Sequence, residues 1–192
     1  MSLLVAPGNY TVKLSVDGQE LSQTLTIKKD PNSGGSEADI QAQAAMLAEL
    51  RKDLESAAEM VNQIEMIRGQ LESLRSLLPA GSDSAAVKAA ADDLDKKLTE
   101  VEDNLIQRRL TGTGQDGVRW PVRLMSKINY LANGLSGSDF GPTTQQREVH
   151  AQFKEQLSAH RKRLDVVMSK DLRAFNEMLR ERGTQNIITR NP

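Results

Sequence analysis

The apolar residues between Ile40 and Leu78 recur every three or four positions, which is the spacing of one face of an amphipathic α-helix. Ser36 and Asp39 predict its start, as a capping box in which Asp replaces the usual Glu or Gln. Pro79-Ala80-Gly81 predict its end. At about 1.5 Å per residue this helix is roughly 60 Å long, so its apolar face needs long neighbours. The face consists of Ile40, Leu47, Leu50, Leu54, Ala57, Val61, Ile64, Ile67, Leu71, Leu74 and Leu78.

Three further helices are predicted from the same spacing. The first covers about 84–110, with Val87, Ala91, Leu94, Leu98, Val101 and Leu105 on its apolar face. A shorter helix follows Trp120-Pro121, with Pro121 in its first turn, and ends near Gly137. Its stripe is Leu124, Ile128, Leu131 and Leu135. The last helix begins at a Thr143/Gln146 capping box and reaches Arg182-Gly183. Its stripe is Val149, Phe153, Leu157, His160, Leu164, Val167, Leu172, Phe175 and Leu179.

These lengths predict a mainly α fold, a long-armed antiparallel helical bundle preceded by a β-hairpin. The first and last arms hold about forty residues each, and the middle two helices together hold about the same number. A broken middle arm between two continuous arms is therefore one arrangement. The other is a four-helix arrangement in which the short helix 120–136 folds back and caps one end.

The hairpin is predicted from alternating apolar and polar residues, a pattern that Gln23 interrupts in the second strand. Tyr10 to Val16 places apolar residues on one face, Asp17-Gly18 provides a type I′ turn, and a second strand returns from Gln19 to Lys28. Two strands alone are marginally stable, so this hairpin needs a partner surface: the helices, a second copy, or the missing strands of a sandwich. We favour the sandwich, since Met1-Ser2-Leu3 resembles an artificial start placed directly before a strand.

The resulting domain organisation has four parts. Residues 1–30 form the hairpin as a truncated segment, 31–35 a flexible linker, 36–183 the helical bundle and 184–192 a C-terminal tail. The 192 residues include no cysteine and two histidines, which exclude disulfide scaffolds, thiolate nucleophiles and sulfur-ligated zinc. The net charge of −1 argues against nucleic-acid binding through excess positive charge, and no apolar run is long enough for membrane insertion.

Charge is distributed unevenly over the arms. Residues 36–79 carry eight acids and four bases, 83–110 seven acids and five bases, and 145–190 six acids and ten bases. Either the basic last arm, with Arg161-Lys162-Arg163, pairs with the acidic arms, or these faces are merely solvated. The acidic cluster of Asp92, Asp93 and Asp95 is interpreted as a solvated face, because adjacent helical positions do not converge on one cation.

The search for chemistry gives no catalytic residue, no metal ligand set and no cofactor motif. His150 and His160 point in different directions on one helix, so they cannot share a metal there. His160 lies on the apolar stripe and is interpreted as a core or boundary histidine. Helices with one apolar stripe also do not select the carboxylate pair, roughly 5 to 10 Å apart, that a glycosidase needs.

One segment concentrates the scarce aromatic residues. Trp120, Arg123, Tyr130 and Phe140 lie within about twenty residues of a chain with 3% aromatic content. Aromatic and Arg side chains dominate binding hot spots, so these four form a candidate interaction surface. The alternative is a small aromatic core at the end of the bundle, and both interpretations can hold together.

The chain resembles a known family at these residues. Pro7 to Val12 with Asp17-Gly18 is similar to the end of the Ig-like segment that follows the β-propeller in bacterial sortilin-like, BNR-repeat (Asp-box) proteins. Pro121–Leu124, Lys127–Leu131 and Asp139–Thr143 are similar to motifs of the long helical tail of those proteins. Trp120 departs from the Tyr expected before the proline.

The resemblance implies a non-catalytic C-terminal accessory or interaction module of a larger exported β-propeller protein, of the kind often labelled a glycosyl hydrolase. Its partner would be the propeller and Ig-like segment of that parent, and any catalytic carboxylates would lie outside this chain. A periplasmic or extracellular location is expected for the parent, although this chain carries no signal peptide of its own. The alternative is a coiled-coil-like self-association module that forms a homodimer, and a contribution to a glycoside hydrolase is the third hypothesis.

Overall fold

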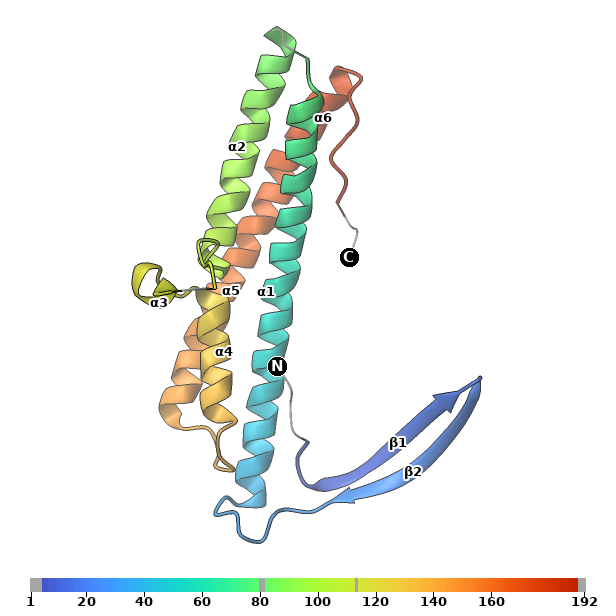
Figure 1. Ribbon diagram of the computed structural model, residues 1–192, viewed down its shortest axis with the longest axis vertical. Coiled ribbons are helices and arrows are strands. Elements are labelled where there is room, and N and C mark those ends of the chain that lie inside the picture. Colours follow the sequence, from blue (N-terminus) through green and yellow to red (C-terminus); the bar gives the residue numbers. More distant parts are fainter. Residues whose placement is uncertain (1–4, 80–81, 113, 190–192) are drawn as a thin grey trace. The chain divides into compact units, whose positions relative to one another are not determined.

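The computed structural model describes residues 5–79, 82–112 and 114–189, and it confirms a mainly α chain that begins with a two-stranded antiparallel hairpin (Figure 1). The strands are β1 (Gly8–Val16) and β2 (Gln19–Ile27). The helices are α1 (Glu37–Leu77), α2 (Ser82–Leu105), α3 (Asp116–Arg119), α4 (Leu124–Leu135), α5 (Thr144–Val166), the π-helix η1 (Val167–Leu172) and α6 (Arg173–Glu181). Among the described residues, none of these helices is long and apolar enough to cross a membrane.

The chain divides into two compact units, which we describe separately. Unit 1 comprises Met1–Lys52 and Asn129–His150, and unit 2 comprises Asp53–Ile128 and Ala151–Pro192. Unit 1 therefore holds the hairpin, the first part of α1, the end of α4 and the start of α5. Unit 2 holds the rest of α1, all of α2 and α3, and the C-terminal helices.

The hairpin has the register and the turn that the alternation predicts. Tyr10 lies opposite Leu25 and Leu14 opposite Leu21, so the apolar residues of both strands share one face. Asp17 and Gly18 have φ values of 49° and 79°, as a type I′ turn requires.

In unit 1 the linker is packed against a loop and is not free. Gly35 is buried, and a Cβ atom at this position would lie 1.9 Å from the backbone oxygen of Asp139. The predicted capping box is confirmed, because the Ser36 hydroxyl accepts a hydrogen bond from the Asp39 backbone N–H while the Asp39 carboxylate accepts one from the Ser36 backbone N–H. Buried Gln43 donates its amide to the carbonyl oxygens of Leu135 (2.8 Å), Ser138 and Phe140 (3.4 Å). Because any Cβ atom at position 35 would collide with the Asp139 backbone oxygen, only glycine allows the linker to lie this close to the loop.

Unit 2 is a bundle in which α1, α2 and the α5–η1–α6 arm lie side by side (Figure 1). Its core confirms the predicted stripes, since every apolar position expected on α2 is buried and none of those expected on α1 is exposed. The fully buried large side chains in this unit include Met60, Ile64, Ile67, Leu71, Leu98, Leu105, Leu164 and Leu179. The apolar stripes of the helices therefore pack against one another within the chain.

Two of the predicted helix boundaries are wrong. The second helix ends at Leu105 and not at 110, and α4 begins at Leu124, so Pro121 lies outside its first turn. Between them lies the unpredicted α3, whose Asp116 accepts hydrogen bonds from the backbone N–H groups of Thr111 (2.7 Å) and Gly112 (2.8 Å). The Asp116 side chain thus bonds backbone N–H groups that would otherwise bond within a longer helix, which favours ending the helix here. The spacing of apolar residues does not reveal this competition.

The last arm contains a π-helical turn that its sequence pattern does not predict. Residues Val167–Leu172 follow π geometry between two α-helical stretches, and the Ser169 hydroxyl donates to the Asp165 backbone oxygen. Both Val167 and Leu172 are buried, five positions apart. One wider turn thus lets both face the core, which the α-helical angle of 100° per residue would not allow.

Candidate interaction surfaces

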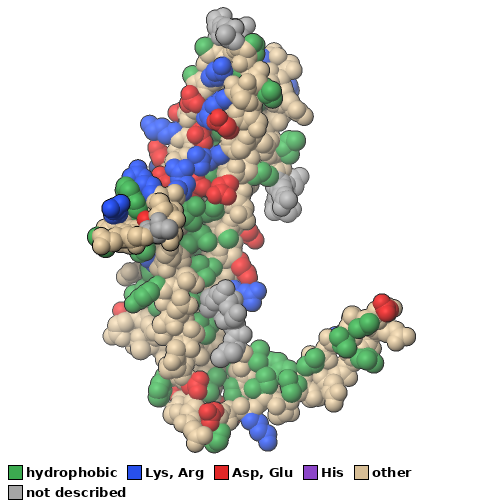
Figure 2. All heavy atoms as spheres, in the orientation of Figure 1, with side chains coloured by type: hydrophobic (Ala, Val, Ile, Leu, Met, Phe, Trp, Pro, Cys, Tyr) green, Lys and Arg blue, Asp and Glu red, His purple; other side chains and the backbone are tan. Residues whose placement is uncertain are grey.

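The apolar face of the hairpin is uncovered. Its side chains Val12, Leu14, Val16, Leu21 and Leu25 are between 49% and 68% exposed. Figure 2 shows hydrophobic side chains gathered along this part of the chain. Large apolar side chains aligned on one sheet face are usually buried against a second layer, so this face is a candidate contact surface.

The other face of the hairpin is polar and internally paired. Thr26 donates its hydroxyl to the Asn9 side-chain oxygen at 2.7 Å, and the Lys13 ammonium lies 3.3 Å from the Glu20 carboxylate. Thr26 and Asn9 lie directly opposite each other in the register, whereas Lys13 lies opposite Ser22 and reaches Glu20 diagonally across the strands. The hairpin is therefore two-sided, with one face suited to water and the other to a partner.

Tyr10 and Gln41 fix the base of the hairpin. The Tyr10 hydroxyl donates to the Ala6 backbone oxygen at 2.6 Å, and the Gln41 side-chain amide of α1 donates to the Pro7 backbone oxygen at 3.2 Å. Ala6 is buried, whereas every residue from 11 to 26 is exposed. Attachment at one end thus leaves the length of the hairpin accessible.

The structure places the four residues predicted as an interaction surface in two units. Tyr130 (82% exposed) on α4 and Phe140 (58% exposed) belong to unit 1, where Phe140 lies against Gly34. Trp120 and Arg123 belong to unit 2 and are half-buried. The Arg109 guanidinium stacks on the Trp120 ring, 4.7 Å from its centroid. These residues thus form two local features, and their role in binding stays a prediction.

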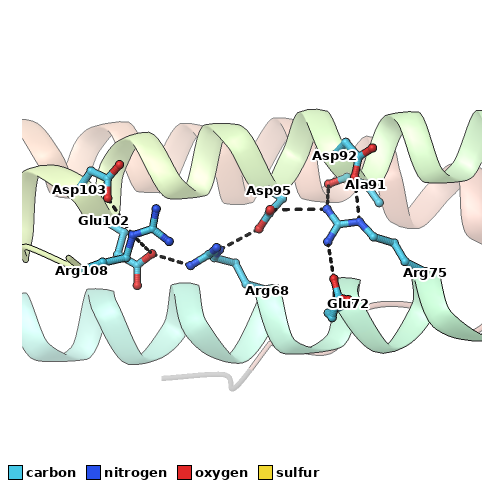
Figure 3. Close-up of polar contacts among 9 residues, drawn as sticks. All are labelled: Arg68, Glu72, Arg75, Ala91, Asp92, Asp95, Glu102, Asp103 and Arg108. Carbon is cyan, nitrogen blue, oxygen red and sulfur yellow. Dashed lines mark hydrogen bonds and ion pairs between the residues drawn. The ribbon is translucent and has the colours of Figure 1, made fainter. Parts of the chain in front are cut away.

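A chain of ion pairs joins α1 to α2 in unit 2 (Figure 3). Arg68 of α1 lies 2.8 Å from the Asp95 carboxylate and 2.7 Å from the Glu102 carboxylate. Arg75, two turns further along α1, lies 2.9 Å from Asp92 and 3.6 Å from Asp95. Asp92 is 69% exposed, as a solvated face predicts, although it also pairs with Arg75. Asp95 is only 27% exposed and lies between the two arginines, so it belongs to the contact between α1 and α2.

Basic residues of the last arm also pair with the acidic arms. Arg163 lies 3.2 Å from Glu100, and Arg161 lies 3.8 Å from Glu59 while donating to the Ser56 backbone oxygen at 3.0 Å. The Lys97 ammonium bridges Asp93 and Asp171, and these two carboxylates raise its pKa. The basic run thus contributes two contacts to internal pairing.

Glu102 is the charged residue that the sequence analysis missed. Its side chain is 0% exposed, its Oε2 accepts from Arg68, and Arg108 lies 3.5 Å away. Its Oε1 is buried and has no hydrogen-bond partner among the described residues. Burial raises the pKa of Glu102, against the lowering effect of Arg68 and Arg108.

The sequence holds a signal for Glu102. It lies four residues after Leu98 and three before Leu105, so it occupies a position of the apolar stripe. Arg108 is six residues further on, which on a continuous helix would turn it about 120° away from the glutamate. The early end of α2 thus allows Arg108 to reach Glu102.

The two histidines lie in different environments. His150 is buried in unit 1, whereas His160 is half-buried in unit 2, where burial and the nearby Arg163 lower its pKa. Within the described ranges, no three His, Cys, Asp or Glu side chains are grouped closely enough to hold a metal ion.

Comparison of the sequence and the structure with known proteins gives no matching family model, no matching curated protein and no matching solved structure.

Proposed function

We propose that the chain is a non-catalytic accessory module of a larger exported protein, attached to it by packing the apolar face of the hairpin against a β-sheet of that protein. The observation that carries the proposal is the exposure of this face along both strands. The resemblance to the C-terminal region of BNR-repeat propeller proteins supports an Ig-like sandwich as the source of that sheet.

The exposed area is large enough to matter energetically. Full burial of one Val or Leu side chain contributes about 1.5 to 3 kcal/mol, so covering the remaining half of five such side chains contributes on the order of 5 kcal/mol. An isolated hairpin has no comparable contribution, because its two strands cannot cover their own face. A second sheet layer therefore supplies what the hairpin lacks.

The backbone supports a sheet as partner. In the described residues β1 pairs only with β2, so each strand also has one unpaired edge. A neighbouring strand from the same protein would pair with an edge, and the opposing sheet of a sandwich would cover the apolar face. Both interactions together explain why the polar face carries Thr, Lys, Ser and Glu side chains that suit water.

The test is to extend the chain by the coding sequence that precedes it in its natural gene and to measure amide hydrogen exchange. We expect hairpin amides to exchange fast in the 192-residue chain and to become protected in the extended protein. The upstream sequence should also begin with a signal peptide and encode a propeller. An extended protein whose hairpin still exchanges fast, or a gene without an upstream domain, refutes the proposal.

Matched variants separate face packing from edge pairing. Leu14→Asp places a charge on the apolar face and should abolish the gained protection of the whole hairpin. Lys13→Asp, on the neighbouring residue of the polar face, should leave most of it. Equal effects of the two substitutions would show that the apolar face is not the packed surface.

Self-association is the second candidate function, and the uncovered face of the hairpin is the observation that favours it. The long apolar stripes of unit 2 are buried within the chain, so they offer no seam for a coiled-coil-like dimer. Light scattering over a concentration series of the 192-residue chain distinguishes the two candidates. A dimer that Leu14→Asp dissociates supports self-association through the hairpin, and a monomer at all concentrations excludes it.

A further inference from the structure

Residues 184–189 run as an extended segment along unit 2 after α6 ends. The chain turns at Gly183, whose φ is +66°, and the segment passes beside α1 (Figure 1). The Thr184 N–H donates to the Leu179 backbone oxygen at 2.9 Å, and beyond it the backbone of Ile187 and Ile188 is bonded by side chains of the helices. The segment thus resembles a bound peptide more than a loop.

Two side-chain amides hold the backbone of this segment from opposite sides. Asn176 of α6 accepts from the Ile187 N–H at 2.8 Å and donates to the Ile187 carbonyl oxygen at 3.0 Å. Gln70 of α1 accepts from the Ile188 N–H at 2.8 Å and donates to the Ile188 carbonyl oxygen at 2.8 Å. Backbone groups of successive residues in an extended chain point to opposite sides, so the two amides replace the two neighbouring strands of a sheet.

These four hydrogen bonds contact backbone atoms of the segment and do not depend on its side chains. Sequence preference comes from one position, Ile187, whose side chain is 6% exposed, while Ile188 is 64% exposed. Main-chain hydrogen bonds that give affinity and alternate side-chain sockets that give specificity are the general mode by which proteins bind extended peptides.

The present occupant fills the groove incompletely. Hollows of about 660 Å³ and about 530 Å³ lie along the segment, the first lined partly by η1 and α6 and the second by the end of α1. Leu77, in the wall of the second hollow, is 81% exposed although it is apolar. The first hollow is lined mainly by polar and charged side chains, whereas the second has the apolar residues Met66, Leu74, Leu77 and Leu78 in its wall. A peptide with larger apolar side chains would therefore cover the part of the second hollow that residues 184–189 leave open.

We infer that the groove between α1 and α6 is a binding site for an extended peptide segment of a partner protein that carries a branched aliphatic residue, and that residues 184–189 occupy this site as an internal ligand. The inference is independent of the role of the hairpin. Gln70 and Asn176 read the backbone of the ligand, and the Ile187 socket selects its side chain.

The internal segment sets the affinity for any peptide offered from outside. A ligand tethered by a short flexible linker competes at an effective concentration on the order of 1 mM. A peptide with an intrinsic Kd of about 100 µM is therefore weakened roughly tenfold in the wild-type chain. Releasing the internal segment should restore the intrinsic affinity.

The probe is a fluorescent peptide with the sequence of residues 183–189, and its binding to full-length chains is measured by fluorescence anisotropy. Ile187→Asp in the chain places a charge in the socket and releases the internal segment. We expect this variant to bind the probe at least tenfold more tightly than the wild-type chain does. The same peptide with Ile187→Asp should not bind either protein.

Substitutions in the groove test the assigned contacts in the Ile187→Asp background. Gln70→Met and Asn176→Leu retain the approximate shape of the side chain and remove its hydrogen bonds, so each should weaken probe binding at least fivefold. Gln63→Met is the matched control, because Gln63 lies two turns earlier on α1 and has no described contact with the segment. It should leave binding unchanged.

Each result has a defined meaning. No probe binding to a folded Ile187→Asp chain, equal binding to variant and wild type, or equal loss in Gln63→Met and Gln70→Met overturns the inference. Dimers of the released variant that the probe does not dissociate also overturn it, since the occupant would then be a second copy. A variant that loses its helical circular dichroism is replaced by Ile187→Ala, which shortens the side chain without adding charge.

Discussion

Replacing Arg68 with methionine should destabilise unit 2 by about 3 kcal/mol near neutral pH, because it removes the cation that is hydrogen-bonded to the buried Glu102 carboxylate. The Glu102 side chain is 0% exposed, and within the described part of the chain Arg68 is the one cation closer than 3 Å to it. Breaking a buried pair on one side costs about 3 to 5 kcal/mol. Arg108, 3.5 Å away, remains in the variant and places the expected value at the lower end.

The pH dependence identifies Glu102 as the cause. Burial already raises the pKa of Glu102, and removal of Arg68 raises it further. The folded state then binds a proton that the unfolded state has lost, so stability falls as pH rises from the ordinary glutamate pKa through the raised folded value. The loss caused by Arg68→Met should therefore be larger at about pH 8 than at a pH close to the ordinary glutamate pKa, because the raised pKa favours the neutral form of Glu102 there.

Urea unfolding followed by helical circular dichroism measures this difference, with linear extrapolation to water. Arg173→Met is the control, since its pair with Glu177 is at least half exposed on both sides and should contribute under about 1 kcal/mol. Adding Glu102→Gln to Arg68→Met should recover most of the loss, because it removes the uncompensated charge. A loss equal to that of Arg173→Met, or a loss independent of pH, would refute the reasoning.

Three further outcomes follow from the local geometry. Gly35→Ala should lower the stability of unit 1 in a melting assay by about 1 to 3 kcal/mol, because the added methyl group meets a backbone oxygen. The control is Gly69→Ala, which adds a methyl group in open space on a helix and should raise stability by about 0.5 to 1 kcal/mol. Hydrogen bonds from Ser36 lower the pKa of Asp39. The stabilisation that the Asp39 carboxylate provides is therefore present above the ordinary aspartate pKa and is lost as pH falls through the folded pKa. In acid unfolding, the stabilities of wild type and Asp39→Asn should converge as pH falls below about 4. Burial lowers the pKa of His160, so the unfolded state binds more protons than the folded state between the folded pKa and about 6.5. The free energy of unfolding should therefore fall with acidification in that range. Chemical unfolding measured across pH should show that His160→Gln removes this part of the fall.

The fold class and most of the core were predictable because they depend on short-range periodicity. The α2 stripe from Val87 to Leu105 is buried as expected, and the capping boxes at Ser36 and Thr143 both form. The hairpin register followed from alternation and from one turn sequence. Each of these signals is read within a few residues and needs no partner to interpret it.

The surfaces were less predictable, since they depend on residues distant in sequence. The net charges of the arms suggested pairing of the last arm with the first two, yet Arg68 and Arg75 join α1 to α2 although both arms are acidic overall. The sequence predicts a C-terminal tail over 184–192 and gives no signal for its contacts, whereas Ile187 is buried and its backbone is hydrogen-bonded to Asn176. The aromatic residues gave a plausible surface, but two of the four lie in each compact unit.

The sequence by itself determined where the long helices lie, which face of each is apolar and which face of the hairpin is apolar, because these properties follow from the 3.6-residue and two-residue periods of the backbone. It did not determine the end of α2, the start of α4, the short helix α3 or the π-helical turn. Only the tertiary structure decided what each polar side chain contacts. Gln70 lies 118 residues from Ile188, and Arg68 lies 34 residues from Glu102. Contacts of this kind depend on how the helices pack, and a burial cost of several kcal/mol for an unpaired charge makes that packing selective.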